Sequence, residues 1–304
     1  MGKKSKFVGI VLVGLWCLSL FTDNIILAAV SPSPEETQKI ESAAPAKATA
    51  VPKQTRKVLI FTLTKGFRHD SIPYITKALG IMGKKTGAFG IVESNDMSIF
   101  KAENLKQFDA VCLNNTTQLD FNDPELRKGL MDFVRSGKGI IGIHAATDNF
   151  YKWPEGAEMM GGLFNGHPWT SEGTWAFKVD DTNNPINAAF KGNGFKLKDE
   201  IYRTKQINLR KNCRVLLSLD MTDQANLNAK GVRPSDKDIP VSWVRSLGSG
   251  KVFYCGIGHN HDLLWNPAIL QHYLDGIQFA LGDLPVDTTP SGEIPLSPEN
   301  PKQN

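Results

Sequence analysis

The sequence Lys57-Val-Leu-Ile-Phe-Thr-Leu63 is a largely apolar run with the length of one β-strand. Such runs are typical of strands that are buried on both faces of a parallel sheet. A second run, Gly139-Ile-Ile-Gly-Ile143, has the same character, and helical patterns separate such runs along the chain. Strands that alternate with helices form parallel βαβ units, with helices covering both faces of the sheet. We therefore predict an α/β fold in three layers around a mostly parallel sheet.

Two helices have clear start signals. Between residues 122 and 137, Asp123 is suited to cap the helix and Pro124 to its first turn. Near the C-terminus, Asn266 and Pro267 have the same arrangement before an apolar-periodic segment. A further helix is predicted over 72–85, ended by Gly87. The predicted strands are 57–63, 89–93, 110–114, 139–143, 174–179, 201–203, 215–219, 241–244 and 251–255.

Composition excludes two broad classes of protein. The chain has 304 residues, of which 41% are hydrophobic, and this is enough to rule out a wholly disordered protein. The formal net charge of +4 is small for this length. A protein that coats nucleic acid would carry a concentrated basic face, so we expect no nucleic-acid partner.

The N-terminus has the layout of a secretory signal peptide. Lys3, Lys4 and Lys6 precede an apolar run of about 15 residues, and the small pair Ala28-Ala29 follows. That run is shorter than the ~20 residues of a spanning helix, although an uncleaved membrane anchor is the alternative. We expect a signal peptide over 1–29, export to the periplasm or the extracellular space, and no membrane association after cleavage. Flexible segments are predicted over 30–56 and 285–304, on either side of one domain over 57–284.

Three cysteines remain after the signal peptide: Cys112, Cys213 and Cys255. Cys112 and Cys255 lie within predicted strands, where buried thiols behave as small hydrophobic groups. Their spacing does not resemble a disulfide-rich scaffold. A peptidase or amidase with either of these two as nucleophile is a weak alternative, because neither follows a strand at a tight turn.

Five histidines follow predicted strands or lie in glycine-rich loops, which are where ligands bind in α/β sheets. Neutral imidazoles at one sheet edge can transfer protons near neutral pH or bind a divalent metal. Their spacing matches no local metal motif, so both interpretations stay open. These residues are His69, His144, His167, His259 and His261.

Other polar and aromatic residues lie beside these histidines. Glu200 is suited to acid–base work or is simply an exposed charge at the start of a strand. Arg68 is suited to hold a sugar hydroxyl or an anion through its forked donors, or is solvated. Trp153, Trp169 and Trp265 could stack on sugar rings, and burial under a loop explains each of them equally well.

Four motifs, in order along the chain, resemble the ThuA, or trehalose-utilisation, family over residues 57–284. They are Leu63-Thr-Lys-Gly-Phe-Arg-His-Asp-Ser-Ile72, Gly142-Ile-His-Ala-Ala-Thr-Asp148, Gly161-Gly-Leu-Phe-Asn-Gly-His-Pro-Trp169 and Gly256-Ile-Gly-His-Asn-His-Asp262. The resemblance implies the class I glutamine amidotransferase-like fold, a flavodoxin-like arrangement. It also implies processing of disaccharides, including oxidised 3-keto sugars.

The same comparison argues against glutamine hydrolysis. Amidotransferases place a nucleophilic cysteine on a tight turn after a strand, and the matching residue here is His144. The later His-Pro-Glu of those enzymes corresponds to His259-Asn-His261 in this chain. An imidazole in place of the thiolate cannot form the usual thioester.

We therefore predict an exported enzyme that processes a small carbohydrate, such as a 3-keto glycoside, by acid–base chemistry. His144 and His259 are the expected base and acid, with Glu200 as an additional catalytic carboxylate. A zinc-like divalent metal is an open alternative, with His144, His167 and His259 as its ligands. The alternative class is a non-catalytic carbohydrate-binding protein on the same scaffold. The expected substrate-binding residues are Arg68, His69, Asp148, His167, Trp169 and His261.

Overall fold

The computed structural model describes residues 1–2, 31–205 and 209–293 of the chain. Residues 3–29 of the predicted signal peptide and the last eleven residues of the predicted tail, 294–304, lie outside the described residues. The described residues between 31 and 293 form one compact unit. No described helix is long and apolar enough to cross a membrane.

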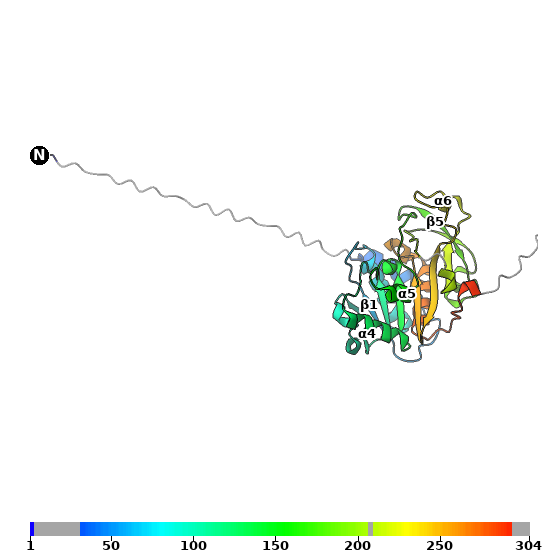
Figure 1. Cartoon of the computed structure of the whole chain (residues 1–304), viewed down its shortest axis with the longest axis horizontal. Helices are drawn as coiled ribbons and strands as arrows, with labels where there is room; N and C mark the ends of the chain where they lie inside the picture. Colours follow the sequence, from blue (N-terminus) through cyan, green and yellow to red (C-terminus); the bar gives the residue numbers. More distant parts are fainter. Residues whose placement is uncertain (3–30, 206–208, 294–304) are drawn as a thin grey trace, which may run out of the picture. The chain divides into compact units, whose positions relative to one another are not determined.

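One mixed sheet forms the centre of the described part (Figure 1). It has nine strands in the order β2-β1-β3-β4-β9-β8-β7-β5-β6. The first five strands in this order are parallel neighbours: β2 (Gly90–Ser94), β1 (Lys57–Phe61), β3 (Ala110–Asn114), β4 (Gly139–Ile143) and β9 (Gly250–Cys255). The remaining pairs are antiparallel and add β8 (Pro240–Leu247), β7 (Arg214–Leu219), β5 (Thr174–Val179) and β6 (Phe195–Lys198). The predicted α/β class with a parallel core is confirmed.

The burial of the parallel strands agrees with their sequences. Strands β3 and β4 are buried at every residue and lie inside the sheet, as their continuous apolar runs predict. Strand β2 forms the edge, and its residues are mostly exposed or half-buried. Of the predicted strands, only 201–203 is absent, because Ile201 makes an isolated bridge to Trp169 in place of a ladder. Strand β6 was not predicted.

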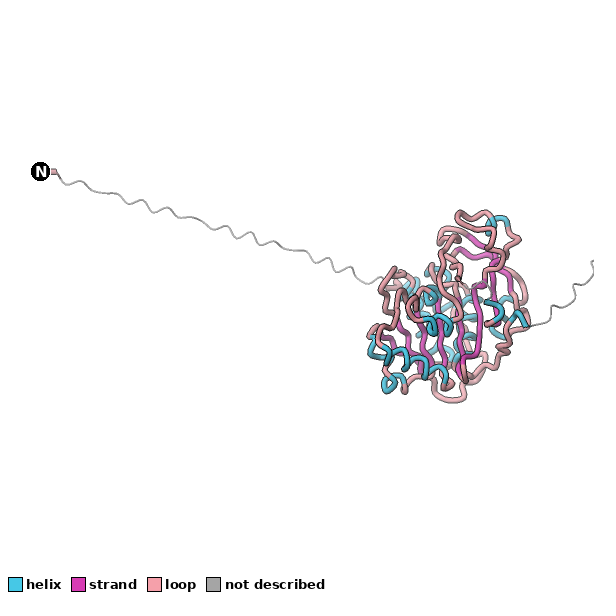
Figure 2. Tube along the Cα trace, viewed as in Figure 1, coloured by secondary structure: helices cyan, strands magenta, loops and turns pink. Residues whose placement is uncertain are grey.

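Helices cover both faces of the sheet, as Figure 2 shows in cyan against the magenta strands. Side chains of α1 (Pro34–Ala43), α2 (Ile72–Thr86) and α7 (Pro267–Ala280) join one apolar layer. Those of α4 (Pro124–Arg135) and α5 (Pro154–Met160) join the other. The shorter elements are α3 (Ala102–Leu105), α6 (Gln224–Leu227) and the 3₁₀ helices η1 (Met97–Phe100), η2 (His144–Thr147), η3 (Pro185–Phe190), η4 (Leu209–Lys211), η5 (His261–Trp265) and η6 (Ser291–Glu293).

The predicted caps are present. The Asp123 side chain accepts a hydrogen bond from the backbone of Glu125 at the start of α4. The Asn266 side chain accepts one from Ala268 at the start of α7. In both helices proline occupies the first turn, where its missing N–H would have no partner inside the helix.

The structure differs from the flexible linker predicted over 30–56. Residues 34–43 form α1, which begins with a capping box between Ser33 and Glu36. Ile40 is fully buried in the apolar layer that contains α2 and α7. Farther along, the Gln278 side chain of α7 accepts hydrogen bonds from the backbone of Thr49 and donates one to Ala50. Packing against α7 therefore orders a segment whose composition is typical of linkers.

The start of the predicted flexible tail is also attached to the fold. Arg214 forms an ion pair with Asp287. The Ser291 side chain accepts a hydrogen bond from the backbone of Val215 at 2.9 Å. The prediction of a free tail is therefore wrong for residues 285–293.

Candidate functional site

The site begins at the turn after β4, where His144 has a left-handed backbone with φ of 44°. This conformation is unfavourable for a residue with a Cβ and is often found at functional turns. The His144 ring is fully buried. Its Nδ1 lies 2.8 Å from the carbonyl oxygen of Gly256, which can only accept, so Nδ1 carries the proton. In the neutral ring Nε2 is therefore the basic nitrogen.

Two more histidines surround His144. His69 comes from the loop after β1, and His259 from the loop after β9. The ring centroids lie 4.9 Å apart for His69 and His144, 5.0 Å for His69 and His259, and 5.4 Å for His144 and His259. Each pair meets edge to face. The predicted convergence of strand ends is thus confirmed for these three residues.

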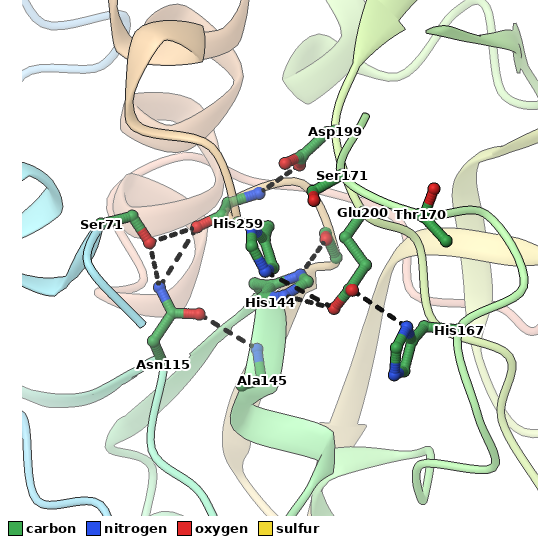
Figure 3. Close-up of polar contacts among 12 residues, drawn as sticks. Ser71, Asn115, His144, Ala145, His167, Thr170, Ser171, Asp199, Glu200 and His259 are labelled. Carbon is green, nitrogen blue, oxygen red and sulfur yellow. Dashed lines mark hydrogen bonds and ion pairs between the residues drawn. The ribbon is translucent and has the colours of Figure 1, made fainter. Parts of the chain in front are cut away.

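Glu200, from the loop after β6, faces the cluster from the antiparallel part of the sheet (Figure 3). Its Oε1 lies 3.7 Å from Nε2 of His144 and 3.9 Å from Nε2 of His259. Its Oε2 lies 2.9 Å from Nδ1 of His167, whose side chain is half exposed. One carboxylate therefore contacts three histidines through two different oxygens.

Burial and mutual proximity control the protonation of this group. Burial, together with the charges of the other histidines, lowers the pKa of His69 to about 2. Burial also lowers the pKa of His259, assisted by His144. Burial alone would raise the pKa of Glu200, but its interactions with His144 and with the other histidines lower it. At neutral pH the site thus holds an ionised carboxylate beside His69 and His259, whose imidazoles resist protonation.

Asn115 links the loops that carry the histidines, and nothing in the sequence patterns singled it out. Its side chain amide donates to Ser71 Oγ and to the Gly258 carbonyl, each at 3.3 Å. Its Oδ1 accepts from the backbone N–H of Ala145 at 3.4 Å (Figure 3). These bonds tie the end of β3 to the loops that follow β1, β4 and β9.

Asp199 holds the loop of His259 from the other side. Its carboxylate accepts hydrogen bonds from the backbone N–H groups of Gly258 at 2.7 Å and Asn260 at 2.8 Å. Asp199 is fully buried, and burial raises its pKa to about 6, against the hydrogen bonds that it accepts. Its neighbour Glu200 faces the histidines, so two adjacent carboxylates have separate roles.

Comparison with protein-family models assigns residues 57–280 to ThuA, described as trehalose utilisation. The chain belongs to the ThuA family. No curated protein is significantly similar in sequence. A ThuA-like protein from Bacteroides uniformis superposes with a TM-score of 0.59 at 20% identity, covering 78% of this chain and 94% of its own. One from Parabacteroides merdae has a TM-score of 0.57 at 18% identity, covering 76% and 92%. At this identity the two structures support the fold alone.

Two residues predicted to bind substrate lie elsewhere in this ThuA protein. Trp169 is fully buried, and its indole N–H donates to the carbonyl of Asn226 at 3.0 Å, so it is a core residue and cannot stack on a sugar. His261 stacks on Tyr74 and lies 3.7 Å from Glu36 of α1. It therefore contacts the helix that the sequence analysis missed, in place of the histidine cluster.

Two others are placed near the surface of the site region. Arg68 is exposed, next to His69 on the loop after β1. Asp148 is half-buried and accepts a hydrogen bond from the hydroxyl of Tyr151. Burial raises the pKa of Asp148, more than that hydrogen bond lowers it. Substrate binding by Arg68 and Asp148 stays a prediction.

The cysteines of the ThuA protein have the structural role predicted for them. Cys112, Cys213 and Cys255 are free and buried. Burial raises the pKa of Cys255 to about 12, and that of Cys112 still further. Neither supplies a thiolate near neutral pH, which removes the cysteine peptidase alternative.

A metal could be held here, although by a different set from the one predicted. Ligand atoms of His69, Glu200 and His259 all lie within 4.8 Å of one another. The predicted set was His144, His167 and His259, and only His259 is common to both. His167 instead contacts the Glu200 oxygen that faces away from His144 and His259.

Proposed function

We propose that this protein is an enzyme that transfers protons on a carbohydrate, with a 3-keto glycoside as the substrate class. The observation that carries the proposal is the tautomer of His144. Its Nδ1–H is committed to Gly256, so a bare Nε2 faces the site within 3.7 Å of an ionised carboxylate. A buried imidazole fixed in this way is a general base. Membership of a trehalose-utilisation family supports a sugar as the substrate.

The proposed reaction is an elimination. The carbonyl at C3 of a 3-keto glycoside acidifies the C–H bond at C2. His144 Nε2 takes the C2 proton, and the electron pair of that bond forms a C1–C2 double bond. The bond between C1 and the glycosidic oxygen breaks, and the leaving oxygen takes up a proton. The products are an unsaturated 3-keto sugar and an alcohol, so atoms and charge balance.

The pair formed by His167 and Glu200 is the better proton donor for the leaving oxygen. We expected His259 as the acid, but its Nδ1 faces the Asn260 side chain oxygen at 3.3 Å. That oxygen only accepts, so in the neutral ring Nε2 of His259 bears no proton. An ionised Glu200 can only accept, so the 2.9 Å contact implies a proton on Nδ1 of His167, and the half-exposed His167 can regain that proton from water.

The test is turnover of 3-keto-trehalose by His144→Gln, with His261→Gln as the matched histidine control outside the cluster. Loss of a general base lowers kcat by about 100-fold or more. The control variant is expected to keep wild-type kcat. Equal rates for His144→Gln and the wild type would refute the proposed role of His144.

Phe67 favours a second candidate function, a carbohydrate-binding protein without activity. Its ring is 65% exposed and stacks beside His259 at a centroid distance of 6.4 Å, a suitable platform for a sugar ring. Binding of trehalose or 3-keto-trehalose, measured by calorimetry, with no product formed by the wild type would establish this alternative.

We also propose that the protein is exported, on the support of the basic and apolar pattern at its N-terminus. Cell fractionation and mass spectrometry of the mature N-terminus test this. Intact residues 1–29 on protein recovered from the cytoplasm would refute it.

A further inference from the structure

Three side chains from separate loops bring metal-binding atoms together. They are His69 after β1, Glu200 after β6 and His259 after β9, and their ligand atoms lie within 4.8 Å of one another. His69 is 2% exposed and Glu200 8% exposed. Distant parts of the chain thus converge on one small, largely buried volume.

Hydrogen-bond acceptors face one another in this volume, and no donor from the described part of the chain lies between them. The Nδ1–H of His259 points to Asn260, whose amide group is oriented by its own bonds to the carbonyls of Ser171 and Lys198. This leaves the lone pair of His259 Nε2 opposite Glu200 Oε1, at 3.9 Å. His144 presents its Nε2 lone pair to the same oxygen at 3.7 Å.

Two buried nitrogens in the cluster also lack a partner. Nδ1 of His69 and Nε2 of His144 have no hydrogen-bond partner among the residues that the structure describes. Buried polar atoms are nearly always paired, so each such atom requires an explanation. A cation bound by the His69 ring gives this ring the partner that no described donor supplies, whereas Nε2 of His144 stays free as the proposed base.

Surrounding residues hold two of these three side chains, Glu200 and His259, as supporting residues hold metal ligands. Glu200 Oε2, the oxygen turned away from His144 and His259, is bound by His167 at 2.9 Å. His259 is oriented by Asn260, and Asp199 fixes the backbone on both sides of His259. Hydrogen bonds of this kind set ring orientation and tautomer in metal sites.

We propose that His69, Glu200 and His259 bind one divalent transition-metal ion. Two imidazoles and one carboxylate suit zinc, iron, cobalt or nickel better than magnesium or calcium. A tetrahedral ion with bonds of about 2.1 Å needs ligand atoms about 3.4 Å apart. The separation of 3.9 Å between Glu200 Oε1 and His259 Nε2 therefore needs only a small closure.

Three protein ligands leave coordination positions open on the ion, next to Nε2 of His144. This part of the inference rests on the proposed function, because an open position would receive the C3 carbonyl oxygen of the sugar. The charge that forms on that oxygen when His144 removes the C2 proton needs a positive partner, and a divalent cation supplies one.

The test uses the full chain, stripped with a chelator and then dialysed against zinc or cobalt(II). Metal content is measured by elemental analysis, and affinity by calorimetry. The variants are His259→Gln and Glu200→Gln, with His261→Gln as the control histidine on the same loop. We expect about one ion per chain in the wild type and the control, and at least about tenfold weaker binding in both variants.

Cobalt(II) supplies a readout that is independent of activity, since its visible absorption reports nitrogen and oxygen ligands directly. Circular dichroism confirms that the variants are folded. Should a variant unfold, the wild-type stoichiometry and the cobalt spectrum still test the proposal. A wild type that binds no ion, or a control as impaired as the variants, would overturn it.

The metal site and the proposed function can fail separately. Turnover by the chelated wild type that still depends on His144 would overturn the role of the metal in the reaction and leave the proposed function intact, and a wild type that binds no ion would overturn the metal site itself. Stoichiometric metal binding without turnover of any 3-keto glycoside would confirm the site and overturn the proposed substrate.

Discussion

The parallel and antiparallel halves of the sheet contribute different chemistry to one site. Loops after the parallel strands β1, β4 and β9 supply His69, His144 and His259. Residues around the antiparallel strands supply the carboxylates Asp199 and Glu200. Without a carboxylate, the three histidines would oppose one another's protonation. The antiparallel extension of the sheet beyond β9 is therefore needed for the proposed chemistry, because its residues supply the negative charge.

The largest expected effect comes from removing that charge. Glu200→Gln keeps the size of the side chain but takes the carboxylate away from three histidines. We expect kcat on 3-keto-trehalose to fall by about 100-fold to 10,000-fold, the range found for general acid–base groups. Glu172→Gln, at an exposed pair with Lys198 in the same half, is the matched control. A loss below about tenfold would show that the antiparallel half is dispensable for catalysis.

The next effect concerns what stabilises the parallel half. Ile40 of α1 is fully buried in the apolar layer that contains α2 and α7, although Ile40 precedes the residues that match the family model. Ile40→Ala is expected to lower the free energy of unfolding by about 2–4 kcal/mol. Chemical denaturation measures this, with the exposed Val51→Ala as control. Equal stability of the two variants would mean that α1 contributes nothing to the fold.

A smaller effect is expected where the halves are joined. Asp199→Asn places an amide where the carboxylate accepts two backbone N–H groups in the His259 loop. Loss of a buried charged acceptor costs about 1–3 kcal/mol of unfolding free energy. Displacement of His259 should also lower metal affinity by about tenfold to 100-fold. Unchanged stability and affinity would show that this connection does not position His259.

The smallest effect is a pH dependence from α7. Burial raises the pKa of Asp275 to about 6, from 3.8, against its bonds with Thr49 and Gln271. The folded state binds this proton more tightly than the unfolded state does. The stability from this group is therefore complete below about pH 4 and is lost as the pH rises through about 6.

Asp275→Asn removes the carboxyl group, and with it the loss of stability at higher pH. We expect its free energy of unfolding to exceed that of the wild type by on the order of 1–2 kcal/mol at pH 7.5, and to match it near pH 4. Asp236→Asn in the antiparallel half is the contrasting variant. Buried Asp236 forms an ion pair with Arg203 at 2.6 Å, so this substitution should destabilise the protein. A stability difference for Asp275→Asn that is constant with pH would contradict the assignment.

The sequence predicted the parallel half well because its signals are local. The apolar run at 58–61 and the caps Asp123 and Asn266 depend on neighbours in the chain. It predicted poorly wherever tertiary contacts decide the outcome. The residues of α1 pack against α2 and η5, and the buried indole of Trp169 donates a hydrogen bond to the carbonyl of Asn226. Periodicity cannot show either contact.

The site was predicted in the same uneven way. His69, His144 and His259 follow parallel strands, so topology alone brings them together. Glu200 was singled out, but its central position depends on the antiparallel extension, whose last strand β6 was not predicted. Asn115 and Asp199 act through backbone groups of other loops. Neither Asp199 nor Asn115 belongs to a sequence pattern that would have singled it out.

The left-handed turn at residue 144 has a practical consequence for protein engineering. The backbone there is fixed by Tyr254, whose hydroxyl donates to the carbonyl of residue 144 at 2.6 Å, and by Asn115 through Ala145. Neither bond involves the side chain at 144. The bonds that hold the backbone of the turn therefore do not depend on the side chain at 144, and the reactive group there can be exchanged. His144→Cys would present a thiol from the same backbone, and would make this scaffold a starting point for designing acyl-transfer catalysts.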